Sequence, residues 1–434
     1  MDTLSLLKSG KLAGVKRLDL SCDLKHFPEE IYDLAESLEI LNLSGNALST
    51  LPDDLSRLSN LRVIFCSDNQ FTHVPEVLGV CRHLEMVGFK ANKIRHLPER
   101  SLPVALRWLI LTDNELEEVP GQLGLCSRLQ KLMLAGNRLQ HLPDEMAACQ
   151  QLELLRISAN CFAALPEWLL SLPRLSWLAY AGNPFSDATG MAAGMSVLQI
   201  GWHELELQHK LGEGASGIIH KANWHAPDGV TPVAVKVFKG SVTSDGLPES
   251  EKAACLAAGL HPNLISATGK ISGHPDDKAG LVMPLVHESY LNLAGPPSLE
   301  SCTRDIYPAD TKFSLDVVLA IAQGMASAAS HLHEQGIMHG DLYAHNTLWN
   351  KQGDCLLGDF GAASFISDAT QAQALQRIEV RAFACLLEEL LERCADPVPD
   401  LLWGLQRSCV QYSVEARPLF TEILQALAWN YCQE

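Results

Sequence analysis

The sequence lacks the features that mark a secreted, membrane-spanning or nucleic-acid-binding protein. Its 434 residues carry 33 Lys and Arg against 51 Asp and Glu, a formal charge of -18, so an anionic partner surface would gain little by binding it. No stretch reaches 18 consecutive apolar residues, and the N-terminus has no apolar run behind basic residues, which argues against a membrane span and a signal peptide. The thirteen Cys include no Cys-x-x-Cys pair, so we expect reduced thiols in a cytoplasmic protein.

The composition is that of a globular chain with more than one core. Hydrophobic residues make up 47% and charged residues 19% of the sequence. A chain of this length and composition predicts two or three domains.

An internal repeat occupies the first part of the chain. Asn recurs at positions 46, 69, 92, 114, 137, 160 and 183, with apolar residues mostly five and three positions before it and Pro six positions after it as far as Pro166. One unit of this length cannot bury its apolar side alone, so stacked units share one core, and the Asn amide can bond turn backbone between neighbours. The pattern resembles the intracellular class of leucine-rich repeat, which implies a horseshoe of about eight units over residues 1–185.

The strand positions that would face away from the repeat core are mostly apolar. They are Ile40, Val63, Met86, Trp108, Lys131, Leu154 and Trp177, with Phe65, Ile110 and Met133 in the adjacent column. An exposed apolar stripe of this size predicts a docking surface for a protein partner or for the chain's own second domain. The alternative is that flanking segments or the second domain cover part of it.

A glycine-rich segment follows a predicted linker, residues 186–200. Gly212, Gly214 and Gly217 have the G-x-G-x-x-G spacing, which lets backbone N–H groups approach phosphates closely. Dinucleotide-binding turns share this spacing. Apolar residues on both sides, and a further apolar strand ending near Lys236, favour a strand-turn-strand in which Lys236 reaches the phosphates of a nucleotide.

Two later stretches combine the residue types that phosphoryl transfer needs. Asp341 and Asn346 lie in a His-Gly-Asp-Leu-Tyr-Ala-His-Asn segment, and Asp359 opens an Asp-Phe-Gly segment. The transferred group needs alignment and charge neutralisation, so one carboxylate can steer the acceptor hydroxyl while Asn346 and Asp359 hold Mg²⁺.

Together these motifs resemble the eukaryotic-type protein kinases, in particular the tyrosine-kinase-like group, across residues 201–434. The resemblance implies an N-lobe at 201–286 and a C-lobe at 287–434, so the expected fold class is a multidomain α/β solenoid plus an α+β, two-lobed kinase-like fold. It implies transfer of the γ-phosphate of ATP to a protein hydroxyl, Ser or Thr rather than Tyr, with Asp341, Lys236 and Asn346 as catalytic residues.

The same resemblance implies the remaining nucleotide contacts. A helix over 248–260 would supply an acidic partner for Lys236, with Glu251 favoured and Glu249 the alternative. Met283 would stand at the gate of the adenine site. The full expected nucleotide set is Gly212, Gly214, Ser216, Gly217, Ile219, Ala234, Lys236, Glu251, Met283, Leu285 and Asp359.

Several positions depart from the family pattern. Gly340 stands where many kinases have Arg, and Tyr343 replaces a typical Lys. No Ala-Pro-Glu is present, so Arg417 lacks its usual Glu partner, and a helix predicted over Ile378–Cys394 leaves about 16 residues after Gly361 for the acceptor platform. Two alternatives therefore stay open: a nucleotide-binding scaffold with little transfer activity, and a small-molecule phosphotransferase.

Overall fold

The computed structural model describes residues 2–186, 198–214, 216–240 and 242–431. The chain divides into two compact units: Met1–Arg156 with Asn160–Leu172, and Ile157–Ala159 with Pro173–Glu434. Most of the predicted linker, residues 186–200, lies outside the described residues.

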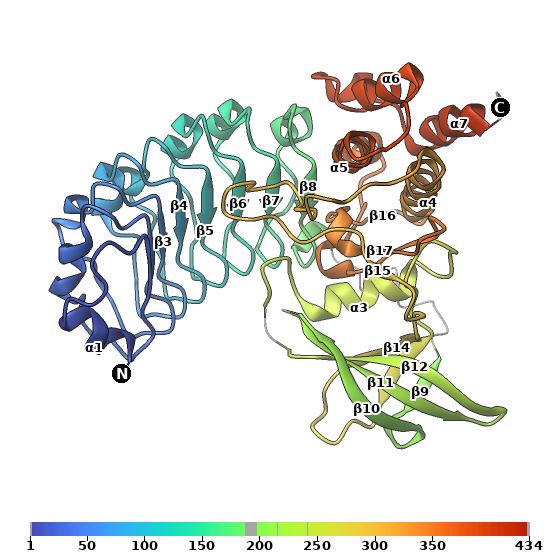
Figure 1. The fold of residues 1–434 in the computed structure, drawn as a ribbon, viewed down its shortest axis with the longest axis horizontal. Helices are drawn as coiled ribbons and strands as arrows, with labels where there is room; N and C mark the ends of the chain where they lie inside the picture. The colour runs from blue at the N-terminus through green and yellow to red at the C-terminus, as the bar shows by residue number, and fades with distance from the viewer. Residues whose placement is uncertain (1, 187–197, 215, 241, 432–434) are drawn as a thin grey trace. The chain divides into compact units, whose positions relative to one another are not determined.

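The first unit is a stack of repeats built on a parallel sheet (Figure 1). Its strands pair in sequence order, each three residues long and shifted by one repeat from the last. The elements are α1 (Thr3–Lys8), β1 (Arg17–Asp19), β2 (Ile40–Asn42), β3 (Val63–Phe65), β4 (Met86–Gly88), β5 (Trp108–Ile110), β6 (Lys131–Met133) and β7 (Leu154–Arg156). Short 3-10 turns, such as η3 (Glu76–Val80) and η5 (Gly121–Leu125), return the chain between strands.

The recurring Asn has the structural role that the sequence predicts. The Asn69 amide nitrogen donates to the Leu43 carbonyl at 2.9 Å and to the Cys66 carbonyl at 3.2 Å. Its amide oxygen accepts from the Leu48 backbone N–H at 2.9 Å. One side chain therefore satisfies turn backbone groups of two neighbouring repeats, which would otherwise be buried without partners.

The stripe is not exposed as predicted, but the alternative that the second domain covers part of it is confirmed at Trp177, whose ring stacks on that of Tyr343. Val63, Met86, Met133, Leu154 and Trp177 are buried, and Ile40, Phe65, Trp108 and Ile110 are half-buried. In an in-register parallel sheet, equivalent side chains stand about 4.8 Å apart and cover one another. The Trp108 indole N–H thus lies 3.4 Å from the Met133 sulfur, and the Lys131 ammonium lies 4.3 Å from the centre of the Trp108 ring.

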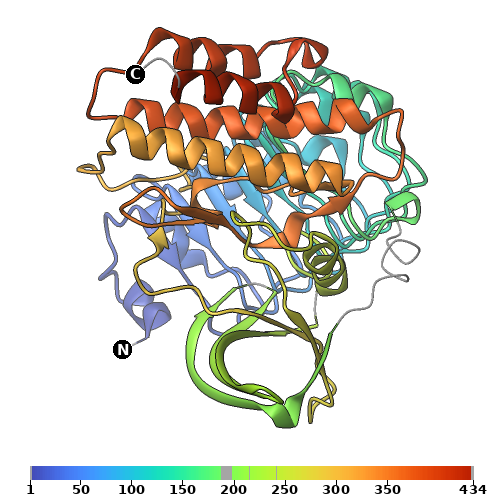
Figure 2. The ribbon, with the colours of Figure 1, turned by 90° about the vertical axis from the view of Figure 1, so that its right-hand side faces the viewer.

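The second unit contains the eighth repeat strand, β8 (Trp177–Ala179), and continues into a two-lobed domain. Its first lobe is a six-stranded sheet in the order β10-β11-β12-β14-β13-β9 (Figures 1 and 2). Helix α3 lies between this sheet and the rest of the unit. The elements are β9 (Gln199–Gly201), β10 (Leu205–Glu213), β11 (Gly217–Ala226), β12 (Gly229–Phe238), α3 (Pro248–Ala257), β13 (Gly269–Ser272) and β14 (Gly280–Pro284).

The second lobe is mostly helical. In Figure 2 its long helices run side by side, and α4 packs against α5 and α7. The elements are β15 (Leu291–Asn292), α4 (Leu315–Glu334), β16 (Ile337–Met338), β17 (Thr347–Trp349), β18 (Cys355–Leu357), β19 (Ser364–Phe365), α5 (Ala372–Glu392), α6 (Asp400–Cys409) and α7 (Phe420–Tyr431).

Two helix boundaries differ from the predictions. Helix α3 ends at Ala257 rather than near residue 260, because Gly259 adopts a φ of +66° that terminates a helix. Helix α5 begins at Ala372, six residues before the predicted Ile378, since the added turn contains good helix formers such as Ala, Gln and Leu. The segment between Gly361 and α5 is therefore even shorter than the sequence suggests.

Helix α4 is, within the described residues, long and apolar enough to cross a membrane by length and composition alone. Its most apolar window is 61% buried in the protein, as expected for the central helix of a folded domain. The helix is therefore weak support for a membrane span.

Candidate active site

A cavity of about 190 Å³ lies in the second unit, where the sheet of the first lobe, α3 and the Asp-Phe-Gly segment meet. Eight of the predicted nucleotide contacts line it: Gly214, Ser216, Gly217, Ile219, Lys236, Glu251, Met283 and Asp359. The predicted residues Gly212, Ala234, Leu285, Asp341 and Asn346 are not among the lining residues. The structure thus gathers most of the predicted nucleotide set around one space.

The glycine-rich segment forms the predicted strand-turn-strand. Strands β10 and β11 are antiparallel, with Gly212 opposite Ile219, and the Gly214 N–H donates to the Gly217 carbonyl at 2.9 Å across the turn. The Lys239 ammonium contacts the Gly214 carbonyl at 3.1 Å and the Glu213 carboxylate at 2.7 Å. No helix follows the turn, so this is not the strand-turn-helix of a dinucleotide-binding fold.

Lys236 and Glu251 form an ion pair against the cavity. Lys236 lies on β12 opposite Leu281 of β14, and Glu251 projects from the first turns of α3. The Lys236 ammonium donates to the Glu251 carboxylate, and both side chains are buried. Burial raises the pKa of the Glu251 carboxyl, and the positive charge of Lys236 opposes that effect. The structure pairs Lys236 with Glu251, while Glu249 bonds Lys252 instead.

A tight hairpin brings Asn346 and Asp359 together. Strands β17 and β18 pair with Thr347 opposite Leu357, and the Gly358 N–H donates to the Asn346 carbonyl at 3.0 Å. The Asn346 amide nitrogen donates to the Asp341 carboxylate at 2.8 Å and to the Asp341 carbonyl at 3.0 Å. Asp359 is exposed and has a left-handed φ of 54°. The three predicted residues therefore meet at one end of the hairpin.

The donor set at this end fits a magnesium ion. The Asn346 amide nitrogen is used by Asp341, which leaves its oxygen as an acceptor, and the exposed Asp359 carboxylate supplies further oxygens. Mg²⁺ prefers such hard oxygen ligands and usually keeps several waters.

A buried carboxylate on α5 holds the backbone of residues 339–346, here called the catalytic loop because they include the predicted catalytic residues Asp341 and Asn346. Glu379 accepts from the Gly340 N–H at 2.7 Å, from the His339 N–H at 3.3 Å and from the His333 ring at 2.7 Å. Burial alone would raise its pKa, but these hydrogen bonds and the nearby His charge outweigh burial, so the pKa of Glu379 is lowered. Glu379 thus supports the backbone immediately before Asp341.

His339 is fully buried under the catalytic loop. Its ring contacts the Gly358 carbonyl at 2.9 Å and packs against Phe360 at 5.3 Å between ring centres. These contacts make the His339 ring part of the packing beneath the loop.

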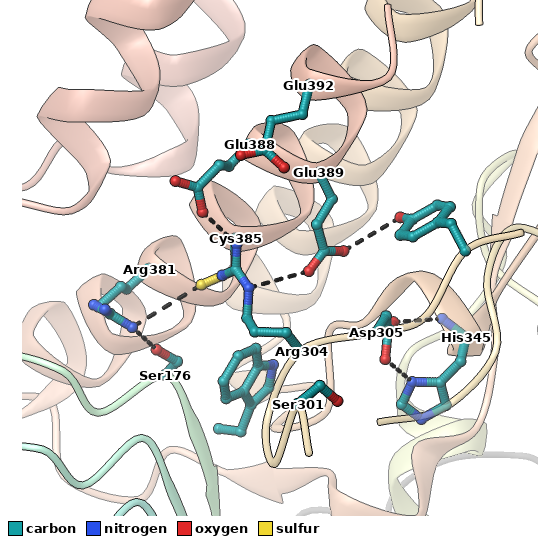
Figure 3. A network of polar contacts seen from close by, with 12 residues as sticks. Ser176, Ser301, Arg304, Asp305, His345, Arg381, Cys385, Glu388, Glu389 and Glu392 are labelled. Carbon is teal, nitrogen blue, oxygen red and sulfur yellow. Dashed lines mark hydrogen bonds and ion pairs between the residues drawn. The ribbon is translucent and has the colours of Figure 1, made fainter. Parts of the chain in front are cut away.

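His345 is held by a carboxylate from an earlier loop. Its ring lies 2.7 Å from one Asp305 oxygen, and its backbone N–H donates to the other at 2.9 Å (Figure 3). Burial opposes protonation, but the hydrogen bond to Asp305 and the charges of Asp341 and Asp359 dominate, so the pKa of His345 is raised. Asp305 therefore favours the protonated form of His345 beside the acidic residues of the loop.

Sequence reasoning missed several lining residues of the cavity: Thr243, Asp245, Cys255, Ile265, Leu281, Phe360 and Gly361. Two of them carried a usable signal. Cys255 follows Glu251 by four residues and shares its helix face, and Leu281 precedes Met283 by two on the same strand face. The Thr243–Asp245 stretch lies in an irregular segment with no periodic pattern to place it.

Comparisons with known proteins match both parts of the chain. Residues 205–393 match the family described as protein tyrosine and serine/threonine kinase, and residues 127–185 and 37–58 match leucine-rich repeat families. The chain is 28% identical over 246 residues to the serine/threonine-protein kinase-transforming protein mos of Moloney murine sarcoma virus, covering 52% of this chain and 63% of that protein.

Other relatives carry related names. The chain is 26% identical over 248 residues to the proto-oncogene serine/threonine-protein kinase mos of Mus musculus, covering 52% of this chain and 68% of the relative. It is 23% identical over 293 residues to a probable serine/threonine-protein kinase of Dictyostelium discoideum, covering 57% of this chain and 17% of the relative. The chain thus spans less than two thirds of some of these relatives.

Proposed function

We propose that this chain, a leucine-rich repeat protein with a protein kinase domain, transfers the γ-phosphate of ATP to a serine or threonine hydroxyl of another protein. The observation that carries the proposal is the meeting of Asp341, Asn346 and Asp359 at one end of the β17–β18 hairpin. The Lys236–Glu251 pair lines the cavity in the same unit.

Each residue then has a chemical task. Asp341, oriented by the Asn346 amide, would accept the proton of the acceptor hydroxyl. Lys236, fixed by Glu251, would hold the phosphates. Asn346 and Asp359 would hold Mg²⁺, which supplies charge neutralisation to the transferred group when bound.

The acceptor class is the finer part of the proposal. Support for serine or threonine comes from relatives whose names describe serine/threonine-protein kinases. The short segment between Gly361 and α5 is the observation that favours a small-molecule acceptor instead, because it offers little chain for a peptide platform.

The proposed role of the repeats is protein binding. Leucine-rich repeats are typical of protein interaction. The half-buried apolar residues of the stripe, which a partner can still contact, are Ile40, Phe65, Trp108 and Ile110. We place this activity in the cytoplasm, since the described cysteines are all free and would stay reduced there.

A transfer assay tests the proposal. Purified full chain, labelled ATP, Mg²⁺ and dephosphorylated casein are compared with Asp341→Asn and Lys236→Met. Loss of the positioned carboxylate should lower transfer by about 10²-fold or more. Asp316→Asn and Lys351→Met make the same chemical changes at exposed positions and should leave transfer unchanged.

Three results would redirect the proposal. Equal labelling by wild type, Asp341→Asn and Lys236→Met would remove the kinase function. ATP binding without transfer to any acceptor would favour the scaffold. Transfer to small hydroxylated compounds such as aminoglycosides, but not to casein, would favour the small-molecule phosphotransferase.

A further inference from the structure

The eighth repeat strand contacts the catalytic loop directly within the second unit. The Trp177 indole N–H donates to the Leu342 carbonyl at 3.1 Å. The Trp177 ring stacks on the Tyr343 ring, with centres 4.2 Å apart and planes 6° apart. Trp177 is 1% and Tyr343 5% exposed, so this contact is as dry as a protein core. The two residues that follow Asp341 in the chain are therefore held by a repeat.

Gly340, immediately before Asp341, fits the same contact. Its φ is +72°, and a Cβ built there would lie 2.7 Å from the Leu178 carbonyl oxygen and 2.6 Å from the Ala362 carbonyl oxygen. Real Cβ atoms do not approach oxygen that closely, and the left-handed conformation already disfavours other residues. The left-handed backbone and the close approach of both Ala362 and β8 therefore leave no room for a side chain at this position.

The strand also reaches the segment after Asp-Phe-Gly. The Tyr180 backbone N–H donates to the Ser364 hydroxyl at 3.0 Å, and both residues are buried. Only ten residues, 362–371, separate Gly361 from the start of α5 at Ala372. The repeat strand thus bonds the part of this short segment that lies nearest to the catalytic loop.

Two buried arginines anchor the base of the repeat. The Arg381 guanidinium donates to the Ser176 hydroxyl at 2.7 Å, as Figure 3 shows. It also donates to the Arg174 carbonyl at 3.0 Å. The Arg417 guanidinium donates to the Pro173 carbonyl at 2.6 Å. These bonds fix the start of β8 against α5 and the chain before α7.

Arg417 shows what the repeat replaces. Its guanidinium also donates to the Gln411 carbonyl at 3.0 Å and to the Arg377 carbonyl at 3.1 Å. Backbone carbonyls thus take the place of a carboxylate. Burial lowers the pKa of Arg417 to about 10. In the kinase family this Arg pairs with a Glu that follows the activation segment, and that Glu is missing from this sequence.

We propose that the eighth repeat, residues 173–180, is a positioning element of the kinase site: Trp177 holds Leu342 and Tyr343 so that Asp341 is aligned for transfer. The repeat performs the supporting task that a longer activation segment performs in other kinases. The inference rests on the proposed function for its kinetic consequence. Its structural part, the fixing of the catalytic loop by Trp177, stands independently.

The opposite role would be inhibition by the repeat. The two roles predict opposite changes in kcat when Trp177 is replaced. Trp177→Phe keeps an aromatic ring for stacking and removes the indole N–H, and Trp177→Ala removes both. Trp202→Phe is the matched control, because Trp202 is half-buried and packs against His274 in the other lobe at 4.3 Å. All variants are made in the full chain, and kcat and KM for ATP are measured with casein.

For positioning, Trp177→Phe should lower kcat about tenfold and Trp177→Ala about 10²-fold, the loss expected when a catalytic group is displaced by about 1 Å. KM for ATP should change less than about twofold, because Trp177 contacts the loop and not the cavity lining. Trp202→Phe should match wild type. An unchanged or increased kcat in Trp177→Phe would overturn the proposal, an increase indicating inhibition.

Hydrogen exchange of the backbone amides in 339–346 gives a readout that needs no activity. Trp177→Phe should speed exchange there and leave strand β12 unchanged, and Trp202→Phe should change neither. If the wild type transfers no more phosphate than Asp341→Asn, the proposed function fails and exchange alone decides the positioning role. Unchanged exchange in the loop would refute it even if the kinase were active.

Discussion

Glu379→Gln is the change that most directly tests how the catalytic loop is held. The carboxylate is 1% exposed and accepts from the backbone N–H groups of His339 and Gly340 and from the His333 ring. Gln has the same shape but only one acceptor oxygen. Whichever way the amide is turned, its NH₂ group faces at least one N–H donor, so at least one hydrogen bond is lost.

The expected cost follows from these contacts. An unsatisfied buried N–H costs about 1–3 kcal/mol, and the remaining bonds lose the strengthening that a charged acceptor gives. We expect a total loss of about 3–4 kcal/mol, within the range for removing one partner of a buried charged pair. Against a typical stability of about 5–15 kcal/mol, the protein should still fold.

Native-state hydrogen exchange measures this loss without assuming two-state unfolding of a two-unit chain. The opening free energy of peptides from α4, α5 and residues 336–346 should fall by the amount above. Glu392→Gln makes the same change on an exposed residue of the same helix and should stay within about 0.5 kcal/mol of wild type.

The pH dependence gives a second check on Glu379. Its folded pKa is lowered, so its stabilisation is fully present above the unfolded value of about 4.3 and is lost as the pH falls through the folded value. The difference between wild type and Glu379→Gln should therefore shrink in acid. A loss below about 1 kcal/mol at neutral pH, or one equal to that of Glu392→Gln, would refute this account of the loop.

Two further changes probe the loop and the repeats. His345 has a raised pKa, so its stabilisation is present below the unfolded value of about 6.5 and is lost as the pH rises through the folded value. Between pH 6 and pH 8.5 the wild-type Tm should fall more than that of His345→Gln, and parallel curves would contradict the role of Asp305. Trp108→Ser should weaken capture of a repeat partner about tenfold or more in a quantitative pull-down, whereas Trp202→Ser should not, and equal capture by both would exclude the Trp108 surface.

Much of the fold and several site contacts follow from local sequence spacing. The Asn period fixes the repeat strands, because each Asn bonds turns of adjacent units. The five-residue step from Asp341 to Asn346 and the hairpin up to Asp359 are also local. The pairing of Lys236 with Glu251 spans only 15 residues.

The contacts that sequence reasoning missed are long-range. Arg417 and Pro173 are 244 residues apart, and Trp177 and Leu342 are 165 apart. Every residue has a backbone carbonyl, and many aromatic residues could stack on a given ring. Residue type and spacing therefore cannot identify these partners. The Asn period therefore ends the repeats at residue 185, whereas the compact unit with the two lobes already includes Ile157–Ala159 and the chain from Pro173 onward.

The burial of outward-facing strand residues was also beyond the sequence pattern. The alternation of side chains in a short strand shows which residues point away from the core. Whether these residues are exposed depends on the side chains that pack over them. Met133 on β6 lies against Trp108 on the neighbouring strand β5, and Trp177 lies against Tyr343 of the catalytic loop. The same apolar column thus packs against a neighbouring repeat at one position and against the 339–346 loop at another.

The contacts that hold β8 in place limit how the number of repeats can vary among related proteins. In a stacked-repeat protein each unit contacts only its neighbours, so units can be gained or lost with little penalty. Loss or replacement of the unit that carries Ser176 and Trp177 would remove bonds to Arg381 and the catalytic loop. We therefore expect repeat number to vary among related chains upstream of this unit, while the last unit and its phase stay constant.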